Sequence, residues 1–164
     1  SQHASVLAGL AGAVPPGEQA VLMEQVLAVA SLIQATVYFR FYVDEALVQA
    51  GLGDRYLERL DLWREMVRLG LTTTPESPEP TRSDSHAWAS HPNYHLLASV
   101  LGIRPGSEGF RSVRIAPMLG AMDRASGTMP HPLGQITVDL VRTPGGGIAG
   151  TITLPTGLPG VFIW

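Results

Sequence analysis

The chain has 164 residues, a formal net charge of −3, 45% hydrophobic and 15% charged residues, and no cysteine. These values indicate a packed globular protein of one domain or two small ones, without disulfides, thiolate catalysis or cysteine metal ligands. The slight negative charge disfavours a nucleic-acid-binding protein. The sequence also contains no run of about 18 uncharged apolar residues that would predict a membrane span.

The first part of the chain has the apolar spacing of helices. Apolar residues three and four positions apart predict helices near residues 4–11, 16–33, 36–49, 54–69 and 91–101. We expect Asp54 to cap the fourth helix, Gly70 to end it, and Tyr56, Met66 and Val67 to share its buried face. The short connections make neighbouring helices antiparallel, which predicts a row of helical hairpins.

From Phe110 onward the apolar period changes from helical to alternating. Segments 111–115, 134–141 and 150–154 predict antiparallel strands, and Gly145 to Gly147 predict a hairpin turn. The chain closes on the apolar run 161–164. We therefore expect an α+β protein whose strands form part of a β-sandwich, and we expect the chain to be a piece of a longer protein.

The polar segment 72–88 is the main candidate for chemistry. It contains two glutamates, an aspartate, an arginine, a histidine and a tryptophan, and its prolines stiffen it between two apolar helices. The segment lies at one rim of the helical array, which would suit a site. Composition alone nevertheless favours a solvated connection in which Asp84 or Ser85 caps the next helix.

Three closely spaced histidines follow, namely His86, His91 and His95. His91 and His95 are four residues apart, so they can share one helix face. A zinc site would also need a third ligand and a catalytic glutamate in register, and the His-Glu-x-x-His motif is absent. We therefore expect surface or capping histidines, and no metal.

An aromatic run, residues 38–42, lies within the third predicted helix. Consecutive aromatic residues point in different directions around a helix, so they cannot all face one core. Core packing explains some of them, and the others are expected to line an opening. Aromatic rings together with carboxylates are typical of a sugar-binding pocket, because sugar C–H faces stack on rings.

Three segments together resemble bacterial α-L-rhamnosidases, which are inverting glycoside hydrolases with a six-hairpin helical toroid. These segments are residues 1–15, 38–47 and 71–105, and the last of them is the most specific. The turns at 130–134 and 154–157 resemble the C-terminal β-sandwich of the same family. The resemblance implies that residues 1–105 are the last hairpins of an (α/α)6 catalytic toroid and that residues 106–164 are part of a β-sandwich.

The resemblance also implies roles for single residues. Glu76 matches the general base, and His86 matches a histidine of the sugar subsite. The further substrate-binding candidates are Tyr38, Phe39, Tyr42, Arg82 and Trp88. The family's general acid lies upstream, so we expect the isolated chain to be inactive and the intact enzyme to cleave terminal α-L-rhamnosides.

The partners implied are a rhamnose-containing glycoside and the remainder of the toroid, with no cofactor, nucleic acid or membrane. The resemblance is to bacterial enzymes, and the cellular location, cytoplasmic or secreted, stays open. Three alternatives stay open as well: a non-catalytic carbohydrate-binding module, another six-hairpin glycosidase, and a structural remnant without a ligand.

Overall fold

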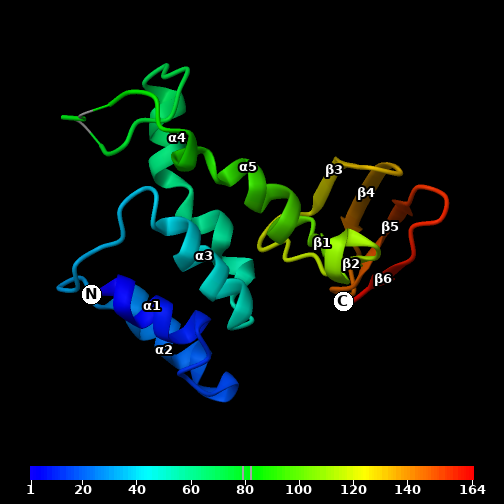
Figure 1. The fold of residues 1–164 in the computed structure, drawn as a ribbon, viewed down its shortest axis with the longest axis horizontal. Coiled ribbons are helices and arrows are strands. Elements are labelled where there is room, and N and C mark those ends of the chain that lie inside the picture. The colour runs from blue at the N-terminus through cyan, green and yellow to red at the C-terminus, as the bar shows by residue number, and fades with distance from the viewer. Residues whose placement is uncertain (79, 82) are drawn as a thin grey trace. The chain divides into compact units, whose positions relative to one another are not determined.

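The computed structural model describes residues 1–78, 80–81 and 83–164. The chain divides into two compact units, Ser1–Pro92 and Asn93–Trp164. The first unit is helical, and the second contains all six strands found in the described residues (Figure 1). The protein is therefore α+β. No helix in the described part of the chain is both long and apolar enough to cross a bilayer.

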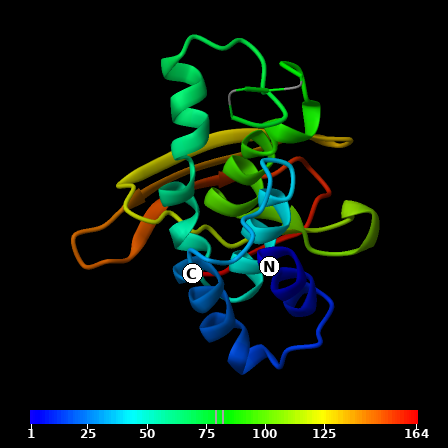
Figure 2. The same cartoon turned by 90° about the vertical axis from the view of Figure 1, so that its left-hand side faces the viewer.

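Six helical segments lie within the first unit. They are α1 (Gln2–Leu10), α2 (Pro16–Ala28), α3 (Arg40–Gln49), the 3₁₀ segment η1 (Gly53–Arg59), α4 (Asp61–Arg68) and the 3₁₀ turn η2 (Ala87–Ser90). Helices α1 and α2 run side by side, as Figures 1 and 2 show, and both contact α3. Their core contains Val6, Met23, Val26, Val43 and Leu47, all nearly inaccessible to solvent.

The second helix ends earlier than its apolar spacing predicts. It stops at Ala28, and Val29 already has an extended backbone, so Ile33 lies outside the helix and is exposed. The following segment is bound to the start of α1 instead. The Gln2 backbone N–H donates to the Ile33 carbonyl at 3.0 Å, and the Gln2 side-chain oxygen accepts from the Ala35 N–H at 2.8 Å. Continued helix would exclude both hydrogen bonds.

The fourth predicted helix is divided in two. Residues Gly53–Arg59 form a 3₁₀ segment and α4 follows it, so the N-cap residues are Leu52 and Leu60 and not Asp54. A 3₁₀ segment places every third residue on the same side. Buried Tyr56 and the Arg59 side chain, which binds Asp44 of α3, therefore lie on one face. The prediction that Val67 is buried is wrong, since it is 76% exposed.

The fourth helix does end where glycine predicts. Gly70 has a φ of +74°, a conformation that glycine adopts without steric cost. Its N–H donates to the Val67 carbonyl, and the N–H of Leu71 donates to the Met66 carbonyl, both at 3.0 Å. These bonds satisfy carbonyls that the helix end would otherwise leave unpaired.

The second unit contains two three-stranded sheets. One has the order β1 (Ile103–Pro105), β2 (Val113–Ile115), β6 (Gly160–Phe162), and the other has the order β3 (Arg124–His131), β4 (Gly134–Arg142), β5 (Ile148–Thr153). Three helical segments belong to the same part of the chain, namely α5 (Pro92–His95), the π-helical turn η3 (Leu96–Val100) and the 3₁₀ turn η4 (Glu108–Phe110). Both sheets contribute to one core, which includes Ile103, Val113, Ile136, Val138 and Leu140.

Strand pairing departs from the prediction in one respect. Strand β6 runs parallel to β2, whereas the other pairs are antiparallel as predicted. The chain between β2 and β6 includes the whole second sheet, and a connection of this length makes a parallel arrangement geometrically accessible. The predicted Gly145–Gly147 turn is confirmed, because the Thr143 N–H donates to the Gly147 carbonyl at 2.9 Å between β4 and β5.

Candidate active site

The polar segment after α4 folds back on itself. The Glu76 N–H donates to the Ser83 carbonyl at 2.9 Å, and the His86 N–H donates to the Thr74 carbonyl at 2.7 Å. The Thr74 hydroxyl also donates to the His86 carbonyl at 2.7 Å, and the Thr73 hydroxyl donates to the Asp84 carbonyl. We call residues 73–76 and 83–86 the paired loop ends. Their hydrogen bonds fix the backbone of Glu76 relative to that of His86.

Glu76 lies on the wall of a pocket of about 610 Å³ within the helical unit. The pocket is lined by the segment before α3, the first residue of α3, one residue of α4, the loop and η2. Its lining residues are Ala35, Thr36, Val37, Tyr38, Arg40, Leu62, Glu76, Ser77, Pro78, Pro80 and Trp88. Glu76 is half-buried at this wall.

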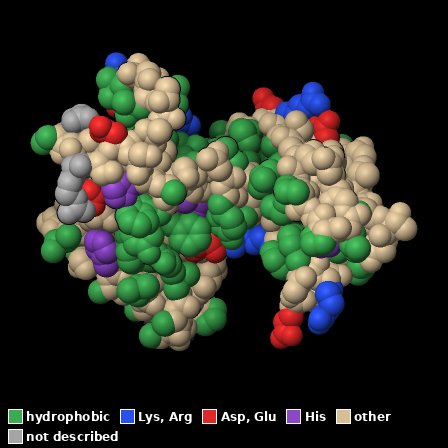
Figure 3. Space-filling view, turned by 45° about the horizontal axis from the view of Figure 1, so that its top comes forward, with side chains coloured by type: hydrophobic (Ala, Val, Ile, Leu, Met, Phe, Trp, Pro, Cys, Tyr) green, Lys and Arg blue, Asp and Glu red, His purple; other side chains and the backbone are tan. Residues whose placement is uncertain are grey.

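Aromatic side chains form one wall of this pocket. Tyr38 and Trp88 line the pocket with ring centroids 5.6 Å apart. His86 is not among the lining residues, but its ring centroid is 4.8 Å from that of Trp88. Tyr38 is 42% exposed and Trp88 is 55% exposed, so both rings offer area to a ligand. Figure 3 shows hydrophobic side chains over a broad area of one face of the helical unit. Exposed rings of this kind can stack on an apolar sugar face.

The other two aromatic candidates are placed differently. Tyr42 does not line the pocket, but its hydroxyl is 3.2 Å from that of Tyr38, and this hydrogen bond raises the pKa of the Tyr38 hydroxyl. Phe39 stacks on His3 with ring centroids 4.2 Å apart and packs against the core of α1, α2 and α3. It therefore lies away from the pocket. Arg82 falls outside the described residues.

Sequence reasoning missed Arg40 as a pocket residue. Its guanidinium carbon is 5.9 Å from the centre of the Trp63 ring, a distance at which a cation is attracted to the ring face. The indole N–H of Trp63 donates to the Ala89 carbonyl at 2.7 Å, which fixes the ring that supports Arg40. The only signal in the sequence is that an arginine interrupts an aromatic run.

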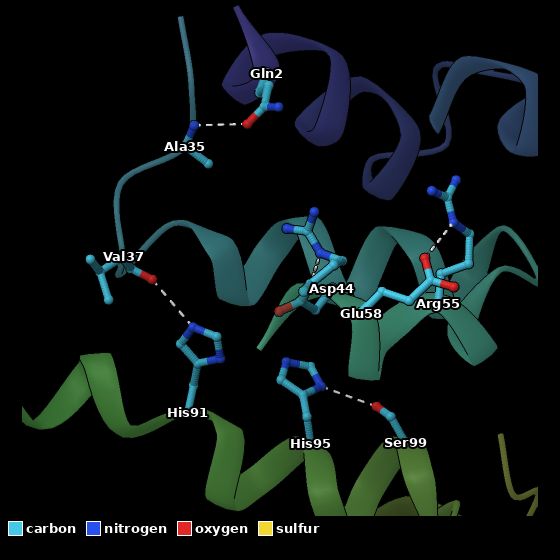
Figure 4. Close-up of polar contacts among 10 residues, drawn as sticks. Gln2, Ala35, Val37, Asp44, Arg55, Glu58, His91, His95 and Ser99 are labelled. Carbon is cyan, nitrogen blue, oxygen red and sulfur yellow. Dashed lines mark hydrogen bonds and ion pairs between the residues drawn. The ribbon is translucent and has the colours of Figure 1, made fainter. Parts of the chain in front are cut away.

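The prediction of surface or capping histidines is wrong for His91 and His95. His91 is 8% exposed and His95 is fully buried. Each has a polar contact: the Nε2 of His91 is 3.2 Å from the Val37 carbonyl, and the Nδ1 of His95 is 3.0 Å from the Ser99 hydroxyl (Figure 4). Because a carbonyl can only accept, the Nε2 of His91 carries a proton. Burial lowers the pKa of His91 to about 4.

We expect the stability of the protein to fall below neutral pH because of His91. Its folded-state pKa of about 4 lies below the value of about 6.5 in an unfolded chain. Between these values the unfolded chain binds more protons, so the free energy of unfolding decreases as the pH falls from 6.5 to 4, by up to about 3 kcal/mol. Urea unfolding at a series of pH values measures this slope. His91→Gln, which cannot titrate, is expected to have a shallower slope, and an equal slope would contradict the assignment.

Comparison with known proteins gives a structural match only. No protein-family profile and no curated protein sequence matches the chain. Solved structures do match: a GH78 family rhamnosidase of Bacillus sp. GL1 superposes with a TM-score of 0.74 and 27% identity over 99% of this chain. Two α-L-rhamnosidases match over the same 99%, one from Aspergillus terreus (TM-score 0.83, 17% identity) and one from Dictyoglomus thermophilum (0.78, 15%).

The chain has the fold of one segment of these enzymes. It spans 20% of the Bacillus chain, 21% of the Aspergillus chain and 20% of the Dictyoglomus chain. Because the match includes almost the whole of this chain, it includes both the helical unit and the strands. The similarity supports a relationship to glycoside hydrolases, and the identity with the Bacillus enzyme is the highest of the three.

Proposed function

We propose that this chain is part of a glycoside hydrolase that removes terminal α-L-rhamnose with inversion of configuration. The observation that carries the proposal is a half-buried carboxylate, Glu76, on a pocket with an exposed aromatic wall, in a chain that has the fold of a rhamnosidase segment. Residues 1–105 would then belong to the catalytic (α/α)6 toroid and residues 106–164 to a β-sandwich domain. The remainder of the toroid is the chain's partner.

In this proposal Glu76 is the general base. An ionised carboxylate accepts a proton from a water molecule, and that water attacks the anomeric carbon from the face opposite the leaving group. The base and the acid of an inverting glycosidase lie about 6.5–9.5 Å apart, which leaves room for the water. The acid that protonates the leaving oxygen would come from the remainder of the toroid, so the 164-residue chain by itself is expected not to hydrolyse rhamnosides.

The substrate-binding roles follow from position. Trp88 and Tyr38 offer exposed ring area to the sugar, and His86 lies against Trp88. The backbone bond between His86 and Thr74 keeps this ring beside the segment that carries Glu76. Tyr42 acts through its hydrogen bond to Tyr38. Arg82 stays a candidate from the resemblance, whereas Phe39 packs against the core.

Hydrolysis of an aryl α-L-rhamnoside by the intact parent protein tests the proposal. Proton NMR of the first product should show β-L-rhamnose, because inversion converts an α-glycoside into the β-anomer. Release of α-L-rhamnose as the first product would contradict the inverting mechanism. A second candidate, a non-catalytic carbohydrate-binding module, is favoured by the exposed Tyr38 and Trp88 rings. Binding of rhamnosides by the parent protein without any hydrolysis would support that alternative.

A further inference from the structure

A second cavity in the helical unit has a volume of about 370 Å³. It shares Arg40 and Leu62 with the pocket that contains Glu76, so one guanidinium lines both spaces. The lining residues are Gln2, Gln34, Arg40, Glu58, Arg59, Asp61 and Leu62. We call this space the arginine cavity. Its size is within the range of roughly 300–1,000 Å³ that is usual for small-ligand sites.

The two carboxylates at the arginine cavity already have cationic partners. Glu58 binds Arg55 at 3.4 Å, and Asp61 binds Arg64 at 2.9 Å. Figure 4 shows the Glu58 carboxylate joined to Arg55. Neither Arg55 nor Arg64 lines the cavity, so these pairs neutralise the carboxylates without using the cavity's own cations.

The two glutamines are occupied as well. The Gln2 oxygen accepts from the Ala35 N–H at 2.8 Å, as Figure 4 shows, and its amide nitrogen donates to the Gln34 oxygen, also at 2.8 Å. The Gln34 amide nitrogen in turn donates to the Leu32 carbonyl at 2.8 Å. The hydrogen-bonding capacity that remains in the cavity therefore belongs mainly to the two arginines.

Both arginines have donors to spare. Arg59 uses its Nε on Asp44, at 2.6 Å. The Arg40 guanidinium donates to no acceptor within residues 1–78, 80–81 and 83–164, although it is half-buried and supported by Trp63. The Arg40 and Arg59 guanidiniums both face the buried Asp44 carboxylate, and of the two only Arg59 binds it. Burial, and then the neighbouring Arg59, lower the pKa of Arg40, and Asp44 opposes this shift.

We propose that Arg40 binds a substrate carboxylate, so that the arginine cavity receives a uronic acid residue linked to the sugar beside Glu76. The planar guanidinium matches a carboxylate with two parallel hydrogen bonds. A single guanidinium with unused donors matches one carboxylate, whereas a phosphate monoester carries about −1.5 to −2 at pH 7. Because Arg40 lines both the arginine cavity and the pocket that contains Glu76, one ligand can occupy both. The identity of the neighbouring sugar rests on the proposed function.

The test compares a rhamnosyl-glucuronate disaccharide with its methyl ester, which has the same shape without the charge. We expect the parent protein to have a kcat/KM about tenfold or more higher for the acid than for the ester. Arg40→Gln should lose this preference. Arg68→Gln is the matched control and should keep it, because Arg68 is exposed, pairs with Glu65 and lines neither cavity. Equal kcat/KM for acid and ester, or a preference retained by Arg40→Gln, would overturn the inference.

A binding measurement separates this inference from the proposed function. Calorimetric titration with methyl glucuronide and with its methyl ester needs no rhamnose and no hydrolysis. Tighter binding of the acid, lost in Arg40→Gln, would support the carboxylate site even if rhamnosides are not cleaved. Hydrolysis of rhamnosides without this difference would refute the carboxylate site alone. If Arg40→Gln does not fold, the difference in affinity between the glucuronide and its methyl ester for the unaltered protein decides whether the carboxylate site exists. Inorganic phosphate that binds as tightly as the glucuronide would also refute it.

Discussion

Replacement of Glu76 by glutamine should lower the rate of rhamnoside hydrolysis by the parent protein by about 10²–10⁴-fold. Glutamine has nearly the same size as glutamate but cannot accept a proton from water. The side chain is half-buried at a pocket wall, so the fold should be retained. The measurements are kcat for an aryl α-L-rhamnoside and the thermal unfolding midpoint of the variant.

Glu79 provides the matched control for this experiment. It is the rival carboxylate, three residues further along, and it lies outside the described residues. Glu79→Gln should retain most of the activity. If Glu79→Gln loses activity while Glu76→Gln keeps it, the general base is Glu79, and the role proposed for Glu76 is wrong.

The ion pair between Asp44 and Arg59 should give the largest change in stability. The Asp44 side chain is 2% exposed, and its oxygen is 2.6 Å from the Nε of Arg59. Burial raises the pKa of Asp44 even though Arg59 opposes that shift. Arg59→Met would remove the guanidinium that is hydrogen-bonded to a buried carboxylate, and we expect the free energy of unfolding to fall by about 3–5 kcal/mol.

Two further variants test whether the loss of stability comes from the unpaired charge of the buried Asp44 carboxylate. The double variant Asp44→Leu/Arg59→Met should recover most of the stability, because it removes both charges from the interior. Arg64→Met breaks an exposed pair and should cost at most about 1 kcal/mol. Urea titration measures the free energy of unfolding of Arg59→Met, of the double variant and of Arg64→Met. A double variant no more stable than Arg59→Met would show that lost packing, rather than charge, explains the effect.

Local signals in the sequence predicted those parts of the fold that depend on neighbouring residues. The end of α4 at Gly70 and the turn before β5 belong to this group, because glycine favours each conformation through its own backbone. The early end of α2 depends instead on Gln2, which is distant in the sequence, and the 3₁₀ form of η1 accompanies a bond to Asp44. Apolar spacing within one segment contains no information about such distant partners.

Strands β1 and β3 could not be predicted from the sequence, the first because of its length and the second because of its composition. Strand β1 is only three residues long, and β3 contains Gly127 and Pro130, which are both unfavourable in strands. The structure explains both residues. A side chain at position 127 would meet Leu101, and Pro130 lies on β3, an edge strand, where an absent N–H costs little.

One part of the candidate site could be predicted from the sequence, and another part could not. Glu76, His86 and Trp88 lie within one short polar segment, so their proximity could be foreseen from the sequence. The contribution of Arg40 could not, because its place on the pocket depends on how α3 packs beside Trp63. Phe39, the immediate neighbour of Arg40 in the same run, packs against the core.

The hydrogen bonds between the paired loop ends have a consequence for how this region can diverge among related proteins. Glu76 and His86 are held by the same short ladder of backbone bonds, so any change that shifts one end also shifts the other. Under the proposed roles of Glu76 and His86, turnover and sugar affinity are therefore linked through this backbone.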